Sequence, residues 1–285
     1  MGQRPSSGTL SPSFYKLSGA GNDFIARVEP REDPAPGEVR AWCRRGLSIG
    51  ADGILVLRKG PDSESPVRMQ HWNADGSPSD LCLNGSRCAV QLAHHLGWHQ
   101  NGRVILETAA GPLDGRRLDG FRTRVRIPWR IEPPQAASLE TPLGTFAGYR
   151  LAVGVPHFVL ATAEPVDDFD LDALGPTLRH HEDLGPEGAN VEVIRWRSSE
   201  LADQRSWERG VEGETLACGT GAIAAVRVGL EIGALRGAAR VRTRGGFDLE
   251  VELEIEADGR ARGSLCGDAR IVARGEILEG AAGAP

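Results

Sequence analysis

Two cysteines stand at the start of predicted helices, and glycine follows each within a few residues. Cys82 begins the stretch CLNGSRCAVQLAHHLG, and Cys218 begins CGTGAIAAVRVGLEIG. The N–H groups in the first turn of a helix have no partner within the helix and favour a nearby negative charge. We therefore expect the pKa of Cys218 to lie below the ordinary thiol value of about 8.5. Taken alone, each segment is equally consistent with a buried thiol beside a tight turn.

The two cysteines occupy matching positions in an internal repeat of roughly 135 residues. The only two tyrosines, Tyr15 and Tyr149, begin the similar stretches YKLSGAGNDFIARVEP and YRLAVGVPHFVLATAEP, in which Phe24 matches Phe158 by spacing. Nearly the same offset relates Cys82 to Cys218, and a predicted strand containing tryptophan precedes each of them. Recurrence of the thiol in both copies makes a chemical role more probable than a lone cysteine would.

Two copies of one domain that face each other form a cleft at their pseudo-twofold axis. Equivalent residues, here two thiols, then approach the cleft from opposite sides. A thiolate on one side can remove a proton from a carbon while the thiol on the other side delivers a proton to the opposite face. The repeat therefore predicts the inversion of a carbon that bears a hydrogen.

The elements that must hold these thiols recur in the same order in each copy. A strand carrying the tyrosine and the phenylalanine comes first, followed by a short helical stretch and the strand GILVLR or NVEVIRW. The cysteine helix comes next, and β-hairpins end the copy. This order predicts an α+β fold of two pseudo-symmetric domains, each a mainly antiparallel β-sheet wrapped around a central helix. All-helical and doubly wound parallel folds fit the pattern poorly.

The domain boundaries follow from the repeat. Residues 1–12 are predicted to be a disordered tail, and the Pro-rich stretch RIEPPQAASLETPLG to be the linker between the domains. The C-terminal domain is expected at 137–268. Because ARIVARGEIL follows the last hairpin of the second copy, it is expected to return to the first sheet, so the N-terminal domain is expected to comprise 13–131 plus 269–280.

Composition argues against several classes of function. A net charge of −6 without a basic block disfavours nucleic acid and anionic membranes as partners, and no run reaches the length of a membrane span. Five cysteines without regular spacing favour a reducing, cytoplasmic location and make a metal site improbable. With only Lys16 and Lys59 as lysines and no GxGxxG or P-loop motif, pyridoxal phosphate and nucleotide cofactors lack support. We expect a small-molecule substrate and no cofactor.

Six motifs together resemble the diaminopimelate epimerase family, over about residues 14 to 278: SGAGNDF, GADGILVL, WNADGSPSDLCLNGSRC, GVPHFV, GANVEVI and WERGVEGETLACGTGA. The resemblance implies an epimerase that uses neither pyridoxal phosphate nor a metal. It further implies interconversion of LL-2,6-diaminopimelate and its meso isomer, on the route to lysine and peptidoglycan, by a homodimer. The repeat by itself indicates only an inversion-type cleft.

The resemblance also implies roles for particular residues. Cys82 and Cys218 correspond to the two acid/base groups of the family. Backbone N–H groups correspond to those that hold the carboxylate at the reacting carbon, at Leu83, Asn84, Gly219 and Thr220. Other side chains match positions that hold the polar groups of the substrate or line the cleft: Asn22, Asn73, His157, Asn190, Glu208 and Arg209. Of these, Arg209 suits a distal carboxylate and Glu208 an ammonium.

Two departures from the family pattern keep alternatives open. Leu83 stands where the family usually has glycine, and Val155 stands where many members have asparagine. These changes favour, as the alternative, a cofactor-independent racemase or epimerase of the same fold that acts on a different amino acid. An inactive binding protein with a thiol redox switch lacks the expected loss of one cysteine, and a thiol hydrolase needs one nucleophile with a base rather than the same thiol twice. The remaining thiols are interpreted as core or incidental residues: Cys43, Cys88 and Cys266.

Overall fold

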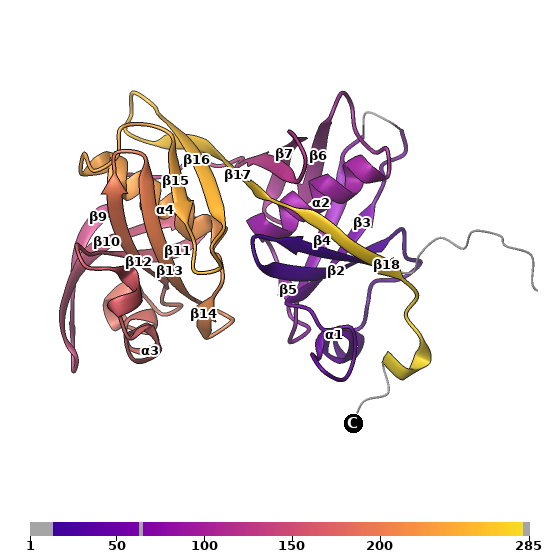
Figure 1. Cartoon of the computed structure of the whole chain (residues 1–285), viewed down its shortest axis with the longest axis horizontal. Coiled ribbons are helices and arrows are strands. Elements are labelled where there is room, and N and C mark those ends of the chain that lie inside the picture. Colours follow the sequence, from indigo (N-terminus) through magenta and orange to yellow (C-terminus); the bar gives the residue numbers. More distant parts are fainter. Residues whose placement is uncertain (1–13, 63–64, 282–285) are drawn as a thin grey trace, which may run out of the picture.

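A computed structural model describes residues 14–62 and 65–281. The chain has the α+β architecture that the repeat predicted, with two halves that each wrap a sheet around one central helix (Figure 1). The predicted tail, residues 1–12, lies outside the described residues. No helix in the described ranges is long and apolar enough to cross a membrane.

The N-terminal half is built around helix α2. Its elements are β1 (Phe14–Gly19), β2 (Asn22–Val28), α1 (Pro36–Cys43), β3 (Gly53–Arg58), β4 (Val67–Asn73), β5 (Pro78–Ser79), α2 (Leu83–His95), β6 (Arg103–Thr108), β7 (Gly111–Arg117) and β8 (Arg122–Arg126).

The C-terminal half repeats this order around helix α4. Its elements are β9 (Gln135–Thr141), β10 (Gly144–Val153), β11 (Val155–Ala161), α3 (Leu171–Arg179), β12 (Asn190–Ser198), β13 (Leu201–Glu208), β14 (Gly213–Thr215), α4 (Gly219–Glu231), β15 (Ala239–Arg242), β16 (Asp248–Ile255) and β17 (Ala261–Asp268). Strand β18 (Arg270–Gly275) follows, and three short 3₁₀ helices complete the description: η1 (Val166–Asp168), η2 (Glu182–Leu184) and η3 (Glu279–Ala281).

Strand pairing relates the two halves. Most pairs are antiparallel, and each half has two parallel pairs at matching places: β2–β3 and β4–β6 in the first, β11–β12 and β13–β15 in the second. Strands β8 and β17 pair across the halves. Strand β18 crosses back to pair with β1, in the place that β9 takes beside β10 (Figure 1). The last of the described strands therefore lies beside the first of them.

The two central helices are buried on most sides. Helix α4 buries ten of its thirteen residues, most of them alanine, glycine, valine and isoleucine. Small side chains let the surrounding strands approach the helix closely, and one continuous apolar core contains residues of both helices, such as Val90 and Val226. The start of each helix is thereby held rigidly in the interior.

Three local predictions differ from the structure. The segment from Tyr15 to Phe24 is a hairpin, β1–β2, rather than one strand, because Ala20 and Gly21 turn the chain with φ of 54° and 96°. The second copy turns at Gly154. The predicted linker also contains a strand, β9, because the alternating residues after the prolines pair with β10.

The hairpin turns differ in length, and this changes which residues are equivalent. Leu17 pairs with Phe24, whereas its counterpart Leu151 pairs with His157. The structural equivalent of Phe24 is therefore His157, and the predicted match of Phe24 with Phe158 was wrong by one residue. Because side chains alternate between the two faces of a strand, this difference of one residue puts His157, and not Phe158, on the face that Phe24 occupies in the first copy.

Candidate active site

Each thiol occupies the N-cap position of a central helix. Cys82 precedes α2 and Cys218 precedes α4, both with extended backbone. The Sγ of Cys82 accepts a hydrogen bond from the N–H of Gly85 at 3.3 Å, and the Sγ of Cys218 accepts one from Gly221 at 3.3 Å. A cap position normally holds serine, threonine, aspartate or asparagine, whose oxygen accepts such bonds. Here sulfur takes that place in both halves.

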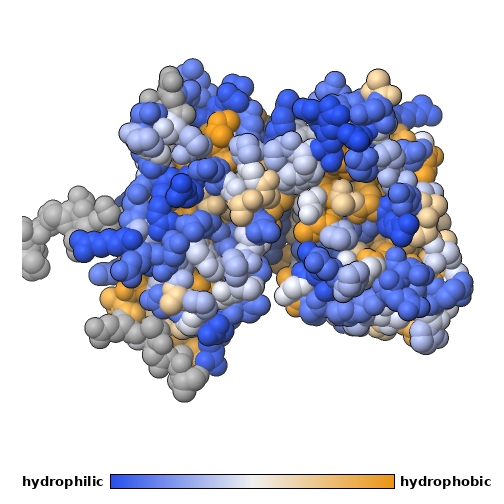
Figure 2. All heavy atoms as spheres, turned by 180° about the vertical axis from the view of Figure 1, so that it is seen from behind, coloured by the Kyte–Doolittle hydropathy of each residue, from blue (hydrophilic) through white to orange (hydrophobic). Residues whose placement is uncertain are grey.

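Both thiols line one cavity of about 650 Å³. Its wall includes residues of both halves, and a space-filling view shows a groove between the halves (Figure 2). Eleven of the twelve predicted site residues contribute to this wall: Asn22, Asn73, Cys82, Leu83, Asn84, Asn190, Glu208, Arg209, Cys218, Gly219 and Thr220. The twelfth, His157, does not.

The thiols are less acidic than the sequence suggested. Burial raises the pKa of Cys82 to about 11, against the opposing effect of the Gly85 N–H. Burial also raises the pKa of Cys218 well above its ordinary value, and the carboxylates of Glu208 and Glu192 add to this rise. The predicted N–H donors are present, but the predicted direction was wrong because desolvation of a thiolate outweighs them. Both thiols therefore hold their protons at neutral pH.

The starts of the two helices meet in the cavity wall. A Cβ added to Gly219 would lie 3.1 Å from the Cβ of Leu83 and 3.3 Å from the Oδ1 of Asn84, so a larger residue would fit only if these neighbours shifted. Asn84 ties the two helix starts together, because its Nδ2 donates to the carbonyl of Ala217 at 2.9 Å and to Asn22. The first-turn N–H groups of two helices thus lie around the same space, which suits an anion.

One side of the cavity carries charge. Burial raises the pKa of Glu208 to about 7, although the hydroxyl of Thr215 donates to this carboxylate and opposes the rise. Next to it, the backbone N–H of Arg209 donates to the Oδ1 of Asn190 at 2.8 Å, and the guanidinium contacts Glu187 at 2.6 Å. Because Glu187 is 75% exposed, this ion pair is weak, and Arg209 remains available to an anionic ligand.

The opposite side carries amides and the carboxylates of Asp52 and Asp80. Asn73 donates to the Oγ of Ser77 at 3.1 Å, and Asn22 donates to Asp52 at 3.2 Å. Asp52 also lines the cavity and was missed as a site residue, although it stands within the quoted motif GADGILVL. Leu83 and Val155, the two departures from the family pattern, both lie in the wall.

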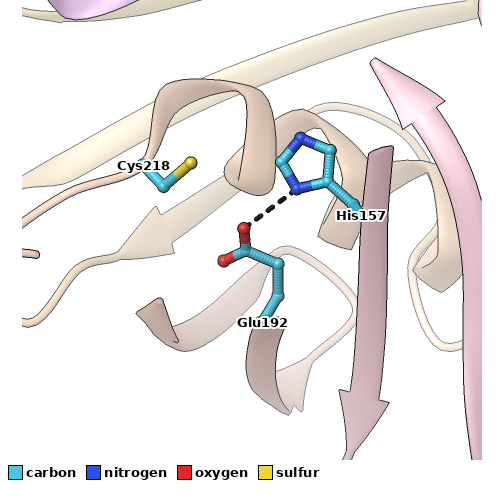
Figure 3. Close-up of side chains that lie close together, drawn as sticks. All are labelled: His157, Glu192 and Cys218. Atoms are coloured by element: carbon cyan, nitrogen blue, oxygen red, sulfur yellow. Dashed lines mark hydrogen bonds and ion pairs between the residues drawn. The ribbon is translucent and has the colours of Figure 1, made fainter. Parts of the chain in front are cut away.

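His157 lies behind Cys218. It is fully buried, it borders a second cavity of about 400 Å³, and its Nδ1 contacts the Oε1 of Glu192 at 3.0 Å. Figure 3 shows these two side chains beside Cys218 at the start of α4. Glu192 was missed by the sequence analysis, although a glutamate between two valines in the strand NVEVIRW was a usable signal.

Among the described residues, one group of three could hold a metal ion: His157, Glu192 and Cys218. A ring nitrogen, a carboxylate oxygen and Sγ lie within 4.8 Å of one another. Within this group, Nδ1 of His157 and Oε1 of Glu192 already contact each other at 3.0 Å, which forms a hydrogen-bonded pair beside the thiol. The other three cysteines are free and buried in the core: Cys43, Cys88 and Cys266.

Sequence comparison places the chain among known proteins. The family model for diaminopimelate epimerase matches residues 14–118 and 149–272. The diaminopimelate epimerase of Gemmatimonas aurantiaca is 39% identical over 277 residues, which cover 93% of this chain and 99% of the relative. That of Chlorobaculum tepidum is 34% identical over 265 residues, which cover 92% and 99%.

Solved structures share the fold at low sequence identity. A probable proline racemase from Agrobacterium radiobacter superposes with a TM-score of 0.72 at 16% identity, covering 94% of this chain and 93% of the other. A phenazine biosynthesis protein of the PhzF family from Bacillus anthracis gives 0.70 at 12% identity, covering 93% and 98%. These likenesses concern the fold, whereas the sequence matches extend over nearly the whole chain. The chain therefore belongs to the diaminopimelate epimerase family of isomerases.

Proposed function

We propose that this chain interconverts LL-2,6-diaminopimelate and meso-diaminopimelate, with Cys82 and Cys218 as the two acid/base groups. The observation that carries the proposal is the position of both thiols, as N-caps of equivalent helices that line one cavity. One thiol gives up its proton to become the base, and the other keeps its proton as the acid. When the reaction reverses, the roles exchange.

The substrate carboxylate at the reacting carbon binds between the two helix starts. Support comes from the first-turn N–H groups of Leu83, Asn84, Gly219 and Thr220 and from the absence of a side chain at Gly219. Negative charge builds on this carboxylate as the α-proton leaves, and fixed N–H donors stabilise that charge without reorganising. The N–H groups of Gly85 and Gly221, which donate to the two sulfurs, favour each thiolate against the cost of its burial.

The charged side of the cavity recognises the substrate's polar groups. Arg209 binds the distal carboxylate through two parallel hydrogen bonds, and Asn190 orients Arg209 through its backbone. Glu208 accepts from an ammonium group, while Asn22 and Asn73 hold polar groups on the other side. A symmetric pair of thiols within an asymmetric pocket suits a substrate with one reacting end and one recognised end.

A second candidate is an epimerase or racemase of the same fold that acts on another amino acid. The observation that favours it is the presence of Leu83 and Val155 in the cavity wall, in place of the family's usual glycine and asparagine. A panel of amino acids, each incubated with the reduced protein and resolved into stereoisomers, separates the two candidates. Turnover of another amino acid at a higher kcat/KM than LL-diaminopimelate would favour the second.

The experiment that tests the mechanism follows the proton. In heavy water, the first meso product formed from LL-diaminopimelate should carry deuterium at the inverted carbon, because the acid thiol has exchanged with solvent. Unreacted substrate should remain largely unlabelled at early times. Early meso product that keeps its original hydrogen would contradict the use of two thiols.

Further proposals concern the context of the enzyme. We infer a cytoplasmic homodimer that serves lysine and peptidoglycan synthesis, and two domains with the boundaries given above. Five free cysteines support a reducing compartment, and the family resemblance supports the dimer. Sedimentation analysis of the reduced protein at micromolar concentration tests the dimer, and a monomer there would contradict it.

A further inference from the structure

The two thiols are equivalent, but the residues beneath them are not. Strand register places Phe24 and Leu55 beneath Cys82, at positions equivalent to those of His157 and Glu192 beneath Cys218. The glycines confirm this arrangement. A Cβ on Gly85 would meet the Leu55 side chain at 3.3 Å, whereas a Cβ on Gly221 would meet the Glu192 carboxylate at 2.1 Å.

The third position beneath each thiol strengthens the contrast. His71 in the N-terminal half is equivalent to Ser206 in the C-terminal half. His71 pairs with Leu55 on the neighbouring strand, and Ser206 pairs with Glu192. Burial lowers the pKa of His71 to about 4, so this ring is neutral. Cys82 therefore rests on an uncharged layer, and Cys218 rests on an ionisable one.

Glu192 is a buried carboxylate whose oxygens are fully engaged. Its side chain has no exposed surface. Oε2 accepts hydrogen bonds from the Nε2 of Gln204 at 2.7 Å and from the hydroxyl of Ser206, and Oε1 contacts the Nδ1 of His157 at 3.0 Å. Burying a carboxylate is costly unless such donors surround it, so this layer is built around the charge of Glu192.

The carboxylate fixes the tautomer of His157. A carboxylate accepts, so Nδ1 must carry the proton in this contact. The other nitrogen, Nε2, is buried and has no hydrogen-bond partner within the described ranges. In a neutral ring Nε2 then holds a lone pair, beside a thiol whose Sγ lies within 4.8 Å of a ring nitrogen and of Glu192 (Figure 3).

We propose that Glu192 is a positioning residue for Cys218, acting through His157, and that beneath Cys82 no histidine is held by a carboxylate in this way. The proton of the Cys218 thiol passes to Nε2, so the S–H bond breaks as the Nε2–H bond forms. Nδ1–H stays bonded to Glu192, and a thiolate and an imidazolium replace a thiol and a neutral ring. The net charge of the group is unchanged, and Glu192 stabilises the imidazolium.

The proposal rests on the proposed function, because it assigns Glu192 a part in that reaction. Its test measures thiol reactivity and does not require turnover of a substrate. Iodoacetamide reacts with the thiolate of each cysteine, and mass spectrometry of the peptides gives a rate for Cys218 and, in the same sample, for Cys82. Glu192→Gln keeps the shape but presents an amide donor to Nδ1, which moves the ring proton to Nε2. We expect the Cys218 rate to fall by at least about tenfold, because Nε2 can no longer accept, and the Cys82 rate to be unchanged.

The opposite sign would overturn the proposal. If Glu192 acted only as a negative charge near Cys218, its neutralisation would favour the thiolate and the Cys218 rate would rise. An unchanged rate would also overturn it. Glu192→Asp, which keeps the charge, should lie closer to the parent than Glu192→Gln, and Glu254→Gln on the exposed face of β16 is the matched control.

A measurement on the unaltered protein covers the case in which Glu192→Gln does not fold. In protein labelled with ¹⁵N-histidine, long-range ¹H–¹⁵N spectra report which ring nitrogen bears the proton. His157 should show the Nδ1–H tautomer, and the Nε2–H tautomer would overturn the proposal. Failure to turn over diaminopimelate would leave both results standing, so the two proposals fail separately.

Discussion

Glu208→Gln tests whether the ionised carboxylate in the cavity serves catalysis. Glu208 lines the cavity with both thiols, and burial raises its pKa to about 7. We expect the ionised form to hold the substrate's ammonium group, so protonation of Glu208 should weaken kcat/KM. The pH dependence of kcat/KM reports groups of the free enzyme, to which this pKa belongs.

The magnitude follows from the pKa. With a pKa of about 7, roughly a tenth of Glu208 is ionised at pH 6 and roughly nine tenths at pH 8. The ratio of the parent's kcat/KM to that of Glu208→Gln should therefore rise about tenfold between these pH values and be level above pH 8. Taking the ratio cancels the ionisations of substrate and thiols that both proteins share.

The assay resolves LL- and meso-diaminopimelate by chromatography at limiting substrate, at half-unit steps of pH. Glu254→Gln, an exposed position on β16, should keep a ratio of one throughout. A level ratio for Glu208→Gln would show that the ionisation of Glu208 is not used. A ratio that falls as pH rises would show that its charge acts mainly by opposing formation of a thiolate at Cys218.

The raised pKa of Glu208 also predicts the direction of a stability change. Between the ordinary value of 4.5 and about 7, the folded state binds more protons at this site than the unfolded state. The contribution of Glu208 to the free energy of unfolding therefore falls as pH rises through that window. Denaturant titrations should show a smaller fall for Glu208→Gln, and identical pH profiles would contradict the assignment.

The remaining predictions concern side chains and backbone of the same cavity. Replacing Cys82 or Cys218 by alanine should reduce epimerisation by about 10²- to 10⁴-fold in a folded protein, and near-normal turnover would remove that thiol from the mechanism. Arg209→Lys should lower kcat/KM on diaminopimelate because the planar fork is lost, and unchanged kinetics would reassign the distal contact. Gly221→Ala should lower the melting temperature more than Gly85→Ala, because the added Cβ would lie 2.1 Å from a buried carboxylate oxygen rather than 3.3 Å from a leucine methyl. Equal melting temperatures would contradict the packing described here.

Sequence reasoning predicted the parts of the site that depend on local pattern. A cysteine followed by glycine before an apolar run indicates a cap, and recurrence at Cys82 and Cys218 indicates a facing pair. The structure has both cysteines as N-caps that line one cavity, because a helix and its cap are determined by residues within a few positions. The α+β fold could be predicted for the same reason, since each copy repeats the same order of strands and helix.

The errors arose where long-range contacts decide the outcome. Spacing matched Phe24 to Phe158, but a turn one residue shorter in the second copy brings His157 into that position. Helix geometry predicted an acidic thiol at Cys218, but burial and nearby carboxylates raise its pKa instead. Neither the strand register nor the raised pKa of Cys218 can be predicted from residues that are close in the sequence. Both depend on which strands and charges pack against the helix start.

The asymmetry beneath the thiols cannot favour one isomer at equilibrium. An enzyme leaves the equilibrium constant unchanged, so a substitution at Glu192 must change kcat/KM for the LL and meso isomers by the same factor. Comparison of the two directions therefore cannot reveal which thiol Glu192 serves, whereas the separate reactivity of Cys82 and Cys218 can. The polar layer beneath Cys218 instead offsets two local effects that disfavour a thiolate at this position. Cys218 lies deeper than Cys82 and closer to carboxylates, both of which oppose its thiolate. A proton acceptor at His157 offsets that opposition, whereas at Cys82 the positive charge of the buried Arg87 acts against the effects of burial and of Glu208.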